Sequence, residues 1–195
     1  REVRVVAGQD HVELVNFVDK ARLKAASYMA REGKESLNFG FAFNVPGGDI
    51  LMDIPLGLMR SEADQMPSAC KNWFTVGRWA DVSAAGRGVT WVTLDAPLVQ
   101  VGGLTATLLN SQTDPNVWRK TVEPTQKLYS WAMNNHWGTN YRAYQEGLTL
   151  FRFVLRPHGG RDVAGAGRFA TGFSFPLLAA KAAGTRPAGA PLLRV

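Results

Sequence analysis

The chain has 195 residues, of which 46% are hydrophobic and 19% are charged, and its formal net charge is +6. This length suits one or two domains, and the low charge with many aromatic residues excludes a disordered chain. No apolar run approaches the ~20 residues that a membrane-spanning helix needs, which argues against a membrane protein. Lys and Arg are scattered, so the positive charge does not predict a nucleic-acid surface.

The only cysteine is Cys70, which cannot form a disulfide within the chain. We expect it to be a small buried side chain, and a lone thiol leaves the cellular compartment undetermined. The chain begins at Arg1 rather than Met and runs directly into strand-like sequence. We therefore expect a fragment of a longer protein.

The first half of the chain alternates apolar and polar residues, which predicts short strands with one face buried. A turn at Gly8-Gln9-Asp10 separates the first two. Residues 21–36 are rich in helix formers but also fit a loop or a strand, and 56–70 resemble an irregular polar connection. The predicted strands are 3–5, 12–20, 37–43 and 50–54.

The second half continues the alternation. Residues 73–82 and 89–94 predict a hairpin, and Gly102-Gly103 predicts a turn between strands 98–101 and 104–109. A polar loop over 110–126 precedes two further strands on either side of residues 134–142. Asp162 is a candidate cap for a short helix through Phe173, although Gly165 and Gly167 weaken the prediction of this helix. We expect an irregular tail over 184–195. These elements predict a mainly all-β antiparallel sandwich with one short helix, formed by residues 1–195 as a single domain or as a fragment of one.

Polar side chains gather between the two strands that follow residue 126. They include Asn134 and Asn135, then His136, Thr139, Asn140 and Arg142. Amides beside aromatic rings suit a carbohydrate, whose hydroxyls need hydrogen-bond partners and whose C–H faces stack on rings. The same composition suits a buried loop that ties two sheets together. Trp137 is the aromatic residue that we expect to face a ligand, whereas most of the other tryptophans belong in the core.

No catalytic residue and no metal site is predicted from the spacing. The histidines His11, His136 and His158 are far apart and lack partners at zinc-ligand spacing. Neither a nucleophile elbow nor a phosphate loop is present. Two carboxylates could cleave a glycoside, and Asp64, Asp81 and Asp95 are candidates by their position near aromatic residues. Asp81 precedes a glycine-rich turn, however, where Asp commonly accepts hydrogen bonds from backbone N–H groups.

A series of segments, in one order over roughly residues 10–180, resembles the C-terminal β-region of glycoside hydrolase family 38, the α-mannosidases, in a bacterial style. The segments are residues 64–67, 73–76, 78–83, 86–89, 95–98, 133–141 and 145–147. Each motif is weak singly, and the ordered set carries the resemblance.

The resemblance implies a galactose-mutarotase-like β-supersandwich, here incomplete, in an enzyme that hydrolyses mannosides with retention. It also implies a catalytic zinc held by a separate domain, because the zinc motif has no counterpart in this chain. This chain would then be non-catalytic and need no cofactor of its own. It would pack on the catalytic domain and lend residues to the sugar site, and Asp95, Asn134, Asn135 and Trp137 are the candidates. Open sheet edges would favour a homodimer or strand exchange.

Three alternatives remain open. A free-standing carbohydrate-binding module would bind mannosides alone. An aldose-epimerase-like enzyme would need an acid and a base across the sugar, for which His136 and Glu146 are the only nearby pair. A plain interaction domain would bind no sugar.

Overall fold

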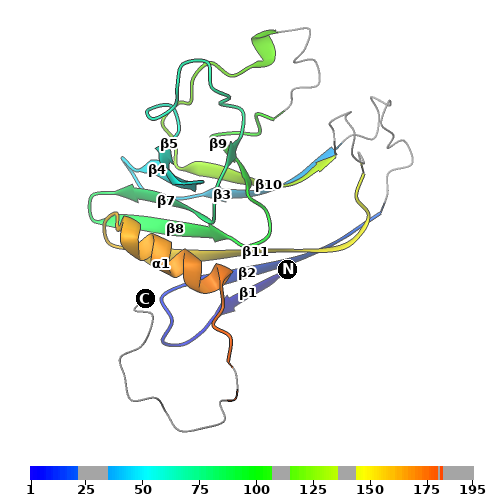
Figure 1. Ribbon diagram of the computed structural model, residues 1–195, viewed down its shortest axis with the longest axis vertical. Helices are drawn as coiled ribbons and strands as arrows, with labels where there is room; N and C mark the ends of the chain where they lie inside the picture. Colours follow the sequence, from blue (N-terminus) through cyan, green and yellow to red (C-terminus); the bar gives the residue numbers. More distant parts are fainter. Residues whose placement is uncertain (22–34, 107–114, 136–143, 180, 182–195) are drawn as a thin grey trace.

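The computed structural model describes residues 1–21, 35–106, 115–135, 144–179 and 181. Two antiparallel sheets pack face to face, and one helix covers the outer side of the larger sheet (Figure 1). The predicted all-β sandwich with one short helix is therefore confirmed. The uncertain segment 21–36, the tail 184–195 and the middle of the polar segment, 136–143, lie almost wholly outside the described residues.

The larger sheet has seven strands, and each pairs antiparallel with its neighbours. Its longest strand, β11, pairs with β2 on one side and with β8 on the other, so distant parts of the chain meet in its centre. In spatial order the strands are β1 (Glu2–Val5), β2 (Val12–Lys20), β11 (Gly147–His158), β8 (Arg87–Thr93), β7 (Trp79–Ala84), β4 (Asp49–Ile54) and β5 (Gly57–Arg60).

The smaller sheet has four strands, and β10 lies near its centre. A bulge between Trp131 and Met133 shifts the register of β10 against β3. A short 3-10 helix, Pro115–Val117, lies in the connection before β10. In spatial order the strands are β3 (Glu35–Ala42), β10 (Lys127–Asn135), β9 (Leu98–Val101) and β6 (Phe74–Thr75).

Aromatic rings from alternate positions fill the space between the sheets. Phe41 of β3 packs against Trp91 of β8 at 5.5 Å between ring centroids and against Phe153 of β11 at 5.0 Å. Trp91 and Phe153 are fully buried, and burial of large aromatic surfaces is the main force that joins the sheets.

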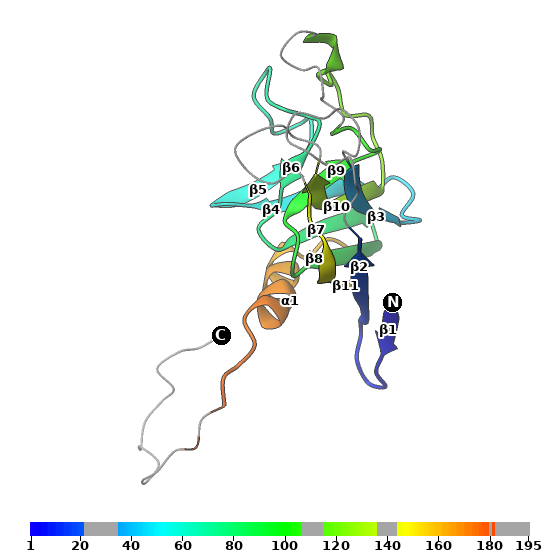
Figure 2. The same cartoon turned by 90° about the vertical axis from the view of Figure 1, so that its right-hand side faces the viewer.

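The helix α1 (Val163–Ser174) lies on the outer face of the larger sheet (Figures 1 and 2). Its small buried residues, Ala166 and Ala170, allow close approach to Trp79 and Val154. The predicted cap is confirmed, because the Asp162 carboxylate accepts a hydrogen bond from the N–H of Gly165 at 2.9 Å. A side chain at Gly165 would collide with that carboxylate, so this glycine permits the cap rather than weakening the helix.

Three sequence predictions need correction. Residues 73–82 do not form one strand, because β6 belongs to the smaller sheet and β7 to the larger. Where the chain passes from one sheet to the other, the N–H of Gly77 donates to the carbonyl of Asp53. Residues 57–60, predicted as irregular, form β5 at the sheet edge. Residues 104–106 are not a strand, since the N–H groups of Thr105 and Ala106 donate to the side chain of Gln100 instead of to a neighbouring strand.

Among the described residues, no helix is long and apolar enough to cross a membrane.

Candidate functional site

The outer face of the smaller sheet, directed away from the larger one, carries amide and aromatic side chains. In β9, Val99 and Val101 point into the core, so Gln100 between them points outward. In β3, Phe39 points inward, and Asn38 points outward by the same alternation. We call this surface the amide-aromatic face; it comprises Ser36, Asn38, Gln100, Tyr129, Trp131, Asn134 and the neighbouring Trp73.

Its aromatic residues form a connected group. Trp73 lies edge-on against the buried Trp131, with 5.8 Å between ring centroids, and is 6.0 Å from Trp118. The ring of Tyr129 lies across β3 where Gly40 has no side chain, because a Cβ at Gly40 would stand 3.0 Å from a Tyr129 ring carbon. Trp73 and Tyr129 are only half-buried, so part of this aromatic surface is accessible to a ligand.

The amides of this face are held in fixed orientations. The Nδ2 of Asn38 donates to the hydroxyl of Ser36 at 3.0 Å, and the Nε2 of Gln100 donates to the Oδ1 of Asn38 at 2.7 Å. The buried Gln100 is itself fixed, because its carbonyl accepts two backbone N–H groups at 2.6 and 2.7 Å. Of these two amides, Asn38 is half-buried, whereas Gln100 is only 2% exposed and serves to orient it. A preoriented amide beside half-exposed rings suits a sugar, since hydroxyl groups need directional partners.

The structure places Asn134 on the amide-aromatic face, opposite Ser36 in the strand pairing. Its neighbour Asn135 is buried, and its Nδ2 has no hydrogen-bond partner among the described residues. Trp137, Asn140 and Arg142 lie outside the described residues. Asn134, which is half-buried, therefore lies on the outer face of β10, whereas Asn135 is buried.

Asp95 lies elsewhere. Its carboxylate accepts two bonds from the guanidinium of Arg152, at 2.8 and 3.0 Å, and a third from the backbone N–H at 2.7 Å. The hydrogen bonds that the Arg152 guanidinium donates to Asp95 raise the pKa of Arg152. Because Phe151 and Phe153 point into the core, Arg152 lies on the outer face of the larger sheet. Asp95 is thus held on the side of the molecule opposite to Asn134.

A buried polar cluster, which we call the Asp81 cluster, was missed from the sequence. Asp81 on β7 is almost fully buried and accepts hydrogen bonds from side chains rather than from backbone N–H groups of the turn. The donors are the hydroxyls of Ser83 and of Thr90 (3.2 Å), and the Nε of Arg161 (3.3 Å). The Nε2 of His158 lies 2.8 Å from the same carboxylate.

This cluster joins elements and does not form a catalytic triad. The Ser83 hydroxyl bonds to Asp81 and not to the histidine, so it lacks a base. The Nδ1 of His158 lies 2.9 Å from the Gly160 carbonyl, so both ring nitrogens face partners within the protein. Arg161 also bonds Asp49 at 2.6 Å, and the cluster thereby fixes the segment before α1 to the β7–β8 hairpin. The sequence does contain one indication of this cluster. Asp81 and Ser83 are two residues apart in a predicted strand, so their side chains lie on the same face.

Two surface depressions were also missed. One, of about 520 Å³, lies between residues 48–50, 60–63 and 121–125. Its Glu62 bonds Lys71 at 2.6 Å and the N–H of Val122 at 2.7 Å. The hydrogen bond from Lys71 lowers the pKa of Glu62, which makes it unsuitable as the proton donor of a glycosidase.

The second depression, of about 530 Å³, lies between residues 68–71 and 118–120. Cys70 lines it and is half-exposed, so the predicted burial of this thiol is only partial. Asp64, a sequence candidate for glycoside cleavage, lies on the loop before this depression. It is paired with Arg60 at 3.1 Å, which lowers the pKa of Asp64.

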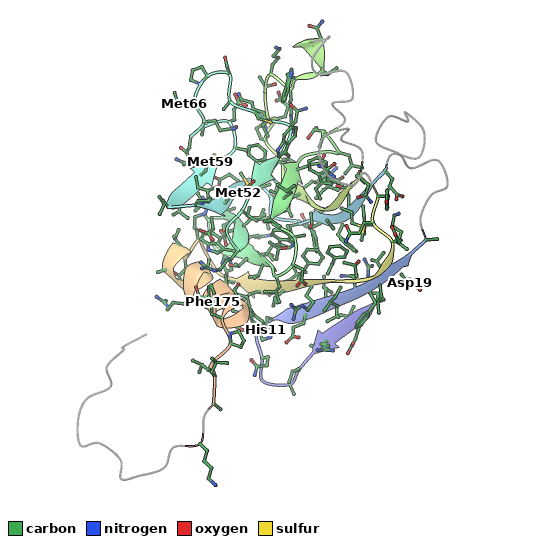
Figure 3. The ribbon with its side chains drawn as sticks, turned by 45° about the vertical axis from the view of Figure 1, so that its right-hand side comes forward. His11, Asp19, Met52, Met59, Met66 and Phe175 are labelled. Carbon is green, nitrogen blue, oxygen red and sulfur yellow. The ribbon has the colours of Figure 1, made fainter. Side chains whose placement is uncertain are left out.

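The two histidines that the structure describes, His11 and His158, contact different groups. His11 lies beside α1, where its ring packs against Phe173 at 5.0 Å and Phe169 at 5.6 Å (Figure 3). Glu146 is exposed on the segment before β11, and its proposed partner His136 lies outside the described residues. Within the described part of the chain, no group of three His, Cys, Asp or Glu residues is placed to hold a metal ion.

A scan against protein-family models found no match to the chain, and neither did a search of curated proteins.

Proposed function

We propose that this chain is the non-catalytic β-sandwich domain of an α-mannosidase-like glycoside hydrolase, and that it supports the sugar-binding site of the whole enzyme. The ordered segments that resemble glycoside hydrolase family 38 and the two-sheet architecture support this proposal. The observation that carries it is the amide-aromatic face. There Asn134 lies opposite Ser36, whose hydroxyl accepts a hydrogen bond from the preoriented Asn38. Asn134 also stands shortly before the polar segment that begins at His136.

The charges of the described residues favour a supporting role over catalysis. A retaining glycosidase needs two carboxyl groups about 5–5.5 Å apart, one of them with a raised pKa. Burial raises the pKa of Asp53, but the Gly77 backbone packs so closely that a Cβ there would stand 2.6 Å from its carboxylate oxygen. Asp64 and Asp95 are each paired with an arginine. We expect a partner domain to supply the catalytic carboxylates and the zinc.

The test uses the intact enzyme that contains this chain, with 4-nitrophenyl α-mannoside as substrate. Removing one amide contact to the sugar, in Asn134→Ala, should lower kcat/KM by about fivefold, because such a hydrogen bond contributes about 1 kcal/mol. Lys127→Ala, at the other end of the same strand, serves as the control and should leave kcat/KM unchanged. Equal activity of Asn134→Ala and the control, or hydrolysis by this chain alone, would contradict the proposal.

A free-standing carbohydrate-binding module is the second candidate, because the same face combines accessible rings with fixed amides. The two candidates differ in what the isolated chain does. A module binds oligomannosides by itself, with heat measurable by titration calorimetry, and loses that binding in Trp137→Ala or Asn134→Ala. A supporting domain gives no heat until the catalytic domain is present.

A further inference from the structure

The strand β1 is at the edge of the larger sheet, and its outer edge pairs with no other described strand. The smaller sheet does not extend over it. Phe39 of β3, the last strand on that side, packs against Phe151 and Phe153 of β11. The strand β2 still packs on the core through Leu14 and Val18, so β1 is the strand that projects beyond the sandwich. Figure 2 shows β1 at the margin of the molecule, next to β2 alone.

The core-facing side of β1 is apolar but exposed. Val3 lies opposite Leu14, which packs on the core, and Val5 lies opposite Val12. Yet Val3 is 58% exposed and Val5 is 72% exposed. A free strand edge next to uncovered valines is a template for pairing with another strand.

The opposite side of β1 carries one charge of each sign. Arg4 lies opposite Glu13 of β2 and 3.9 Å from its carboxylate. Arg4 also bonds Glu2 on its own strand at 2.7 and 3.1 Å. The strand therefore presents an acid and a base, two residues apart, on one face.

We propose that the partner of this edge is a second copy of the same chain, joined through antiparallel pairing of β1 with β1. In a twofold pair, one residue of β1 lies directly opposite its own copy, and directly opposite residues point to the same face of the sheet. The pair can therefore be centred on Glu2, Val3 or Arg4 with the apolar and charged faces each kept continuous. Centring on Glu2 or Arg4 puts two like charges opposite each other. Only centring on Val3 places Glu2 of each copy opposite Arg4 of the other.

In that register the two strands are self-complementary. The four charges alternate in sign on one face, and the two Val3 side chains meet on the other. The symmetry is the twofold, isologous kind that closes as a dimer. Four residues a strand form a small interface compared with the roughly 800 Å² a partner of a standard complex. The dimer is therefore reversible and appears at high protein concentration. This inference is independent of the proposed function.

A charge-exchange experiment tests the register. Glu2→Arg and Arg4→Glu each place like charges opposite one another in the self-dimer, and each should weaken dimerisation about tenfold. In an equimolar mixture of the two variants, the two arginines of one copy face the two glutamates of the other, so opposite charges are restored at both positions. The double variant Glu2→Arg/Arg4→Glu restores them within a dimer of identical chains. Both should recover dimerisation, as measured by sedimentation velocity over a concentration series.

The controls are Glu146→Arg and Lys127→Glu, which make the same changes in net charge at exposed sites away from β1. They should dimerise like the unchanged chain. A chain that stays monomeric at its highest soluble concentration would overturn the proposal. So would a dimer that survives both single charge reversals, or a mixture that fails to recover dimerisation, since association would then use another surface or register.

Discussion

Replacing Asp81 by Ala tests whether the Asp81 cluster stabilises the sandwich. The substitution removes a carboxylate whose side chain is only 2% exposed and which joins Thr90, His158 and Arg161. Removing one partner of a buried ion pair typically costs about 3–5 kcal/mol, because the other charge remains desolvated.

The lower end of that range applies here. Arg161 keeps Asp49 as a partner at 2.6 Å, and its side chain is 27% exposed, so water can partly replace the lost carboxylate. Burial alone would lower the pKa of Arg161, but its bonds to Asp49 and Asp81 raise it, so the guanidinium stays charged and needs a partner. The hydroxyls of Ser83 and Thr90 each lose an acceptor, at about 1 kcal/mol each. Because these terms overlap, we expect a loss of about 3 kcal/mol.

The assay is thermal and urea unfolding followed by tryptophan fluorescence. For a chain of this size, a loss of about 3 kcal/mol lowers Tm by roughly 6–12 °C. The control is Asp10→Ala, which breaks the ion pair with Arg156, where Asp10 is 61% exposed. An exposed pair contributes under about 1 kcal/mol, so this variant should stay close to the unchanged chain. If Asp81→Ala loses no more than Asp10→Ala, the cluster does not stabilise the fold and the reasoning fails.

Three further changes test the packing and the electrostatics. Gly88→Ala would drive a methyl group into the hydroxyl of Ser83 and the ring of the facing histidine, and should cost about 1–3 kcal/mol in urea unfolding. Gly165→Ala should cost about 1 kcal/mol by displacing the cap of α1, visible as a lower helical signal in circular dichroism; an unchanged signal and Tm would contradict the capping role. Burial raises the pKa of Asp53 above its usual 3.8, so this group stabilises the fold most at low pH, and that contribution is lost as pH rises through the raised pKa. Asp53→Asn should therefore raise the free energy of unfolding at neutral pH and reduce its fall above pH 3.8, and equal pH profiles for the two chains would refute the assignment.

Prediction from the sequence succeeded where alternation is long and the turn residues are distinctive. Residues 37–43 follow period two over seven positions, and residues 35–42 form β3. Residues 12–20 form β2 although the alternation there is interrupted by adjacent apolar residues at 14–15 and 17–18. It failed at residues 73–82, where the apolar pattern is continuous although Val76 and Gly77 lie between two sheets. Local alternation records which side of a strand is buried, but it carries no information about which sheet the strand joins.

The candidate site was predicted only in part. Asn134 became a candidate because it stands next to other amides in the sequence. Asn38 and Gln100 were missed, although they share its sheet face, because they lie in other strands more than 30 residues away from it and from each other. Asp95 and Asn134 were grouped by their place in the resemblance, but the ion pair with Arg152 holds Asp95 on the other side of the molecule.

By itself, the sequence determined that this chain forms antiparallel strands with apolar inner faces and one capped helix, because period-two burial and turn chemistry are local properties. Only the tertiary structure decided how the strands divide between two sheets, and which polar side chains meet. Those outcomes depend on contacts such as Asp81 with His158, 77 residues apart. The uncovered valines of β1 belong to the same class: alternation marks Val3 and Val5 as residues to be buried, and the smaller sheet stops before it can cover them.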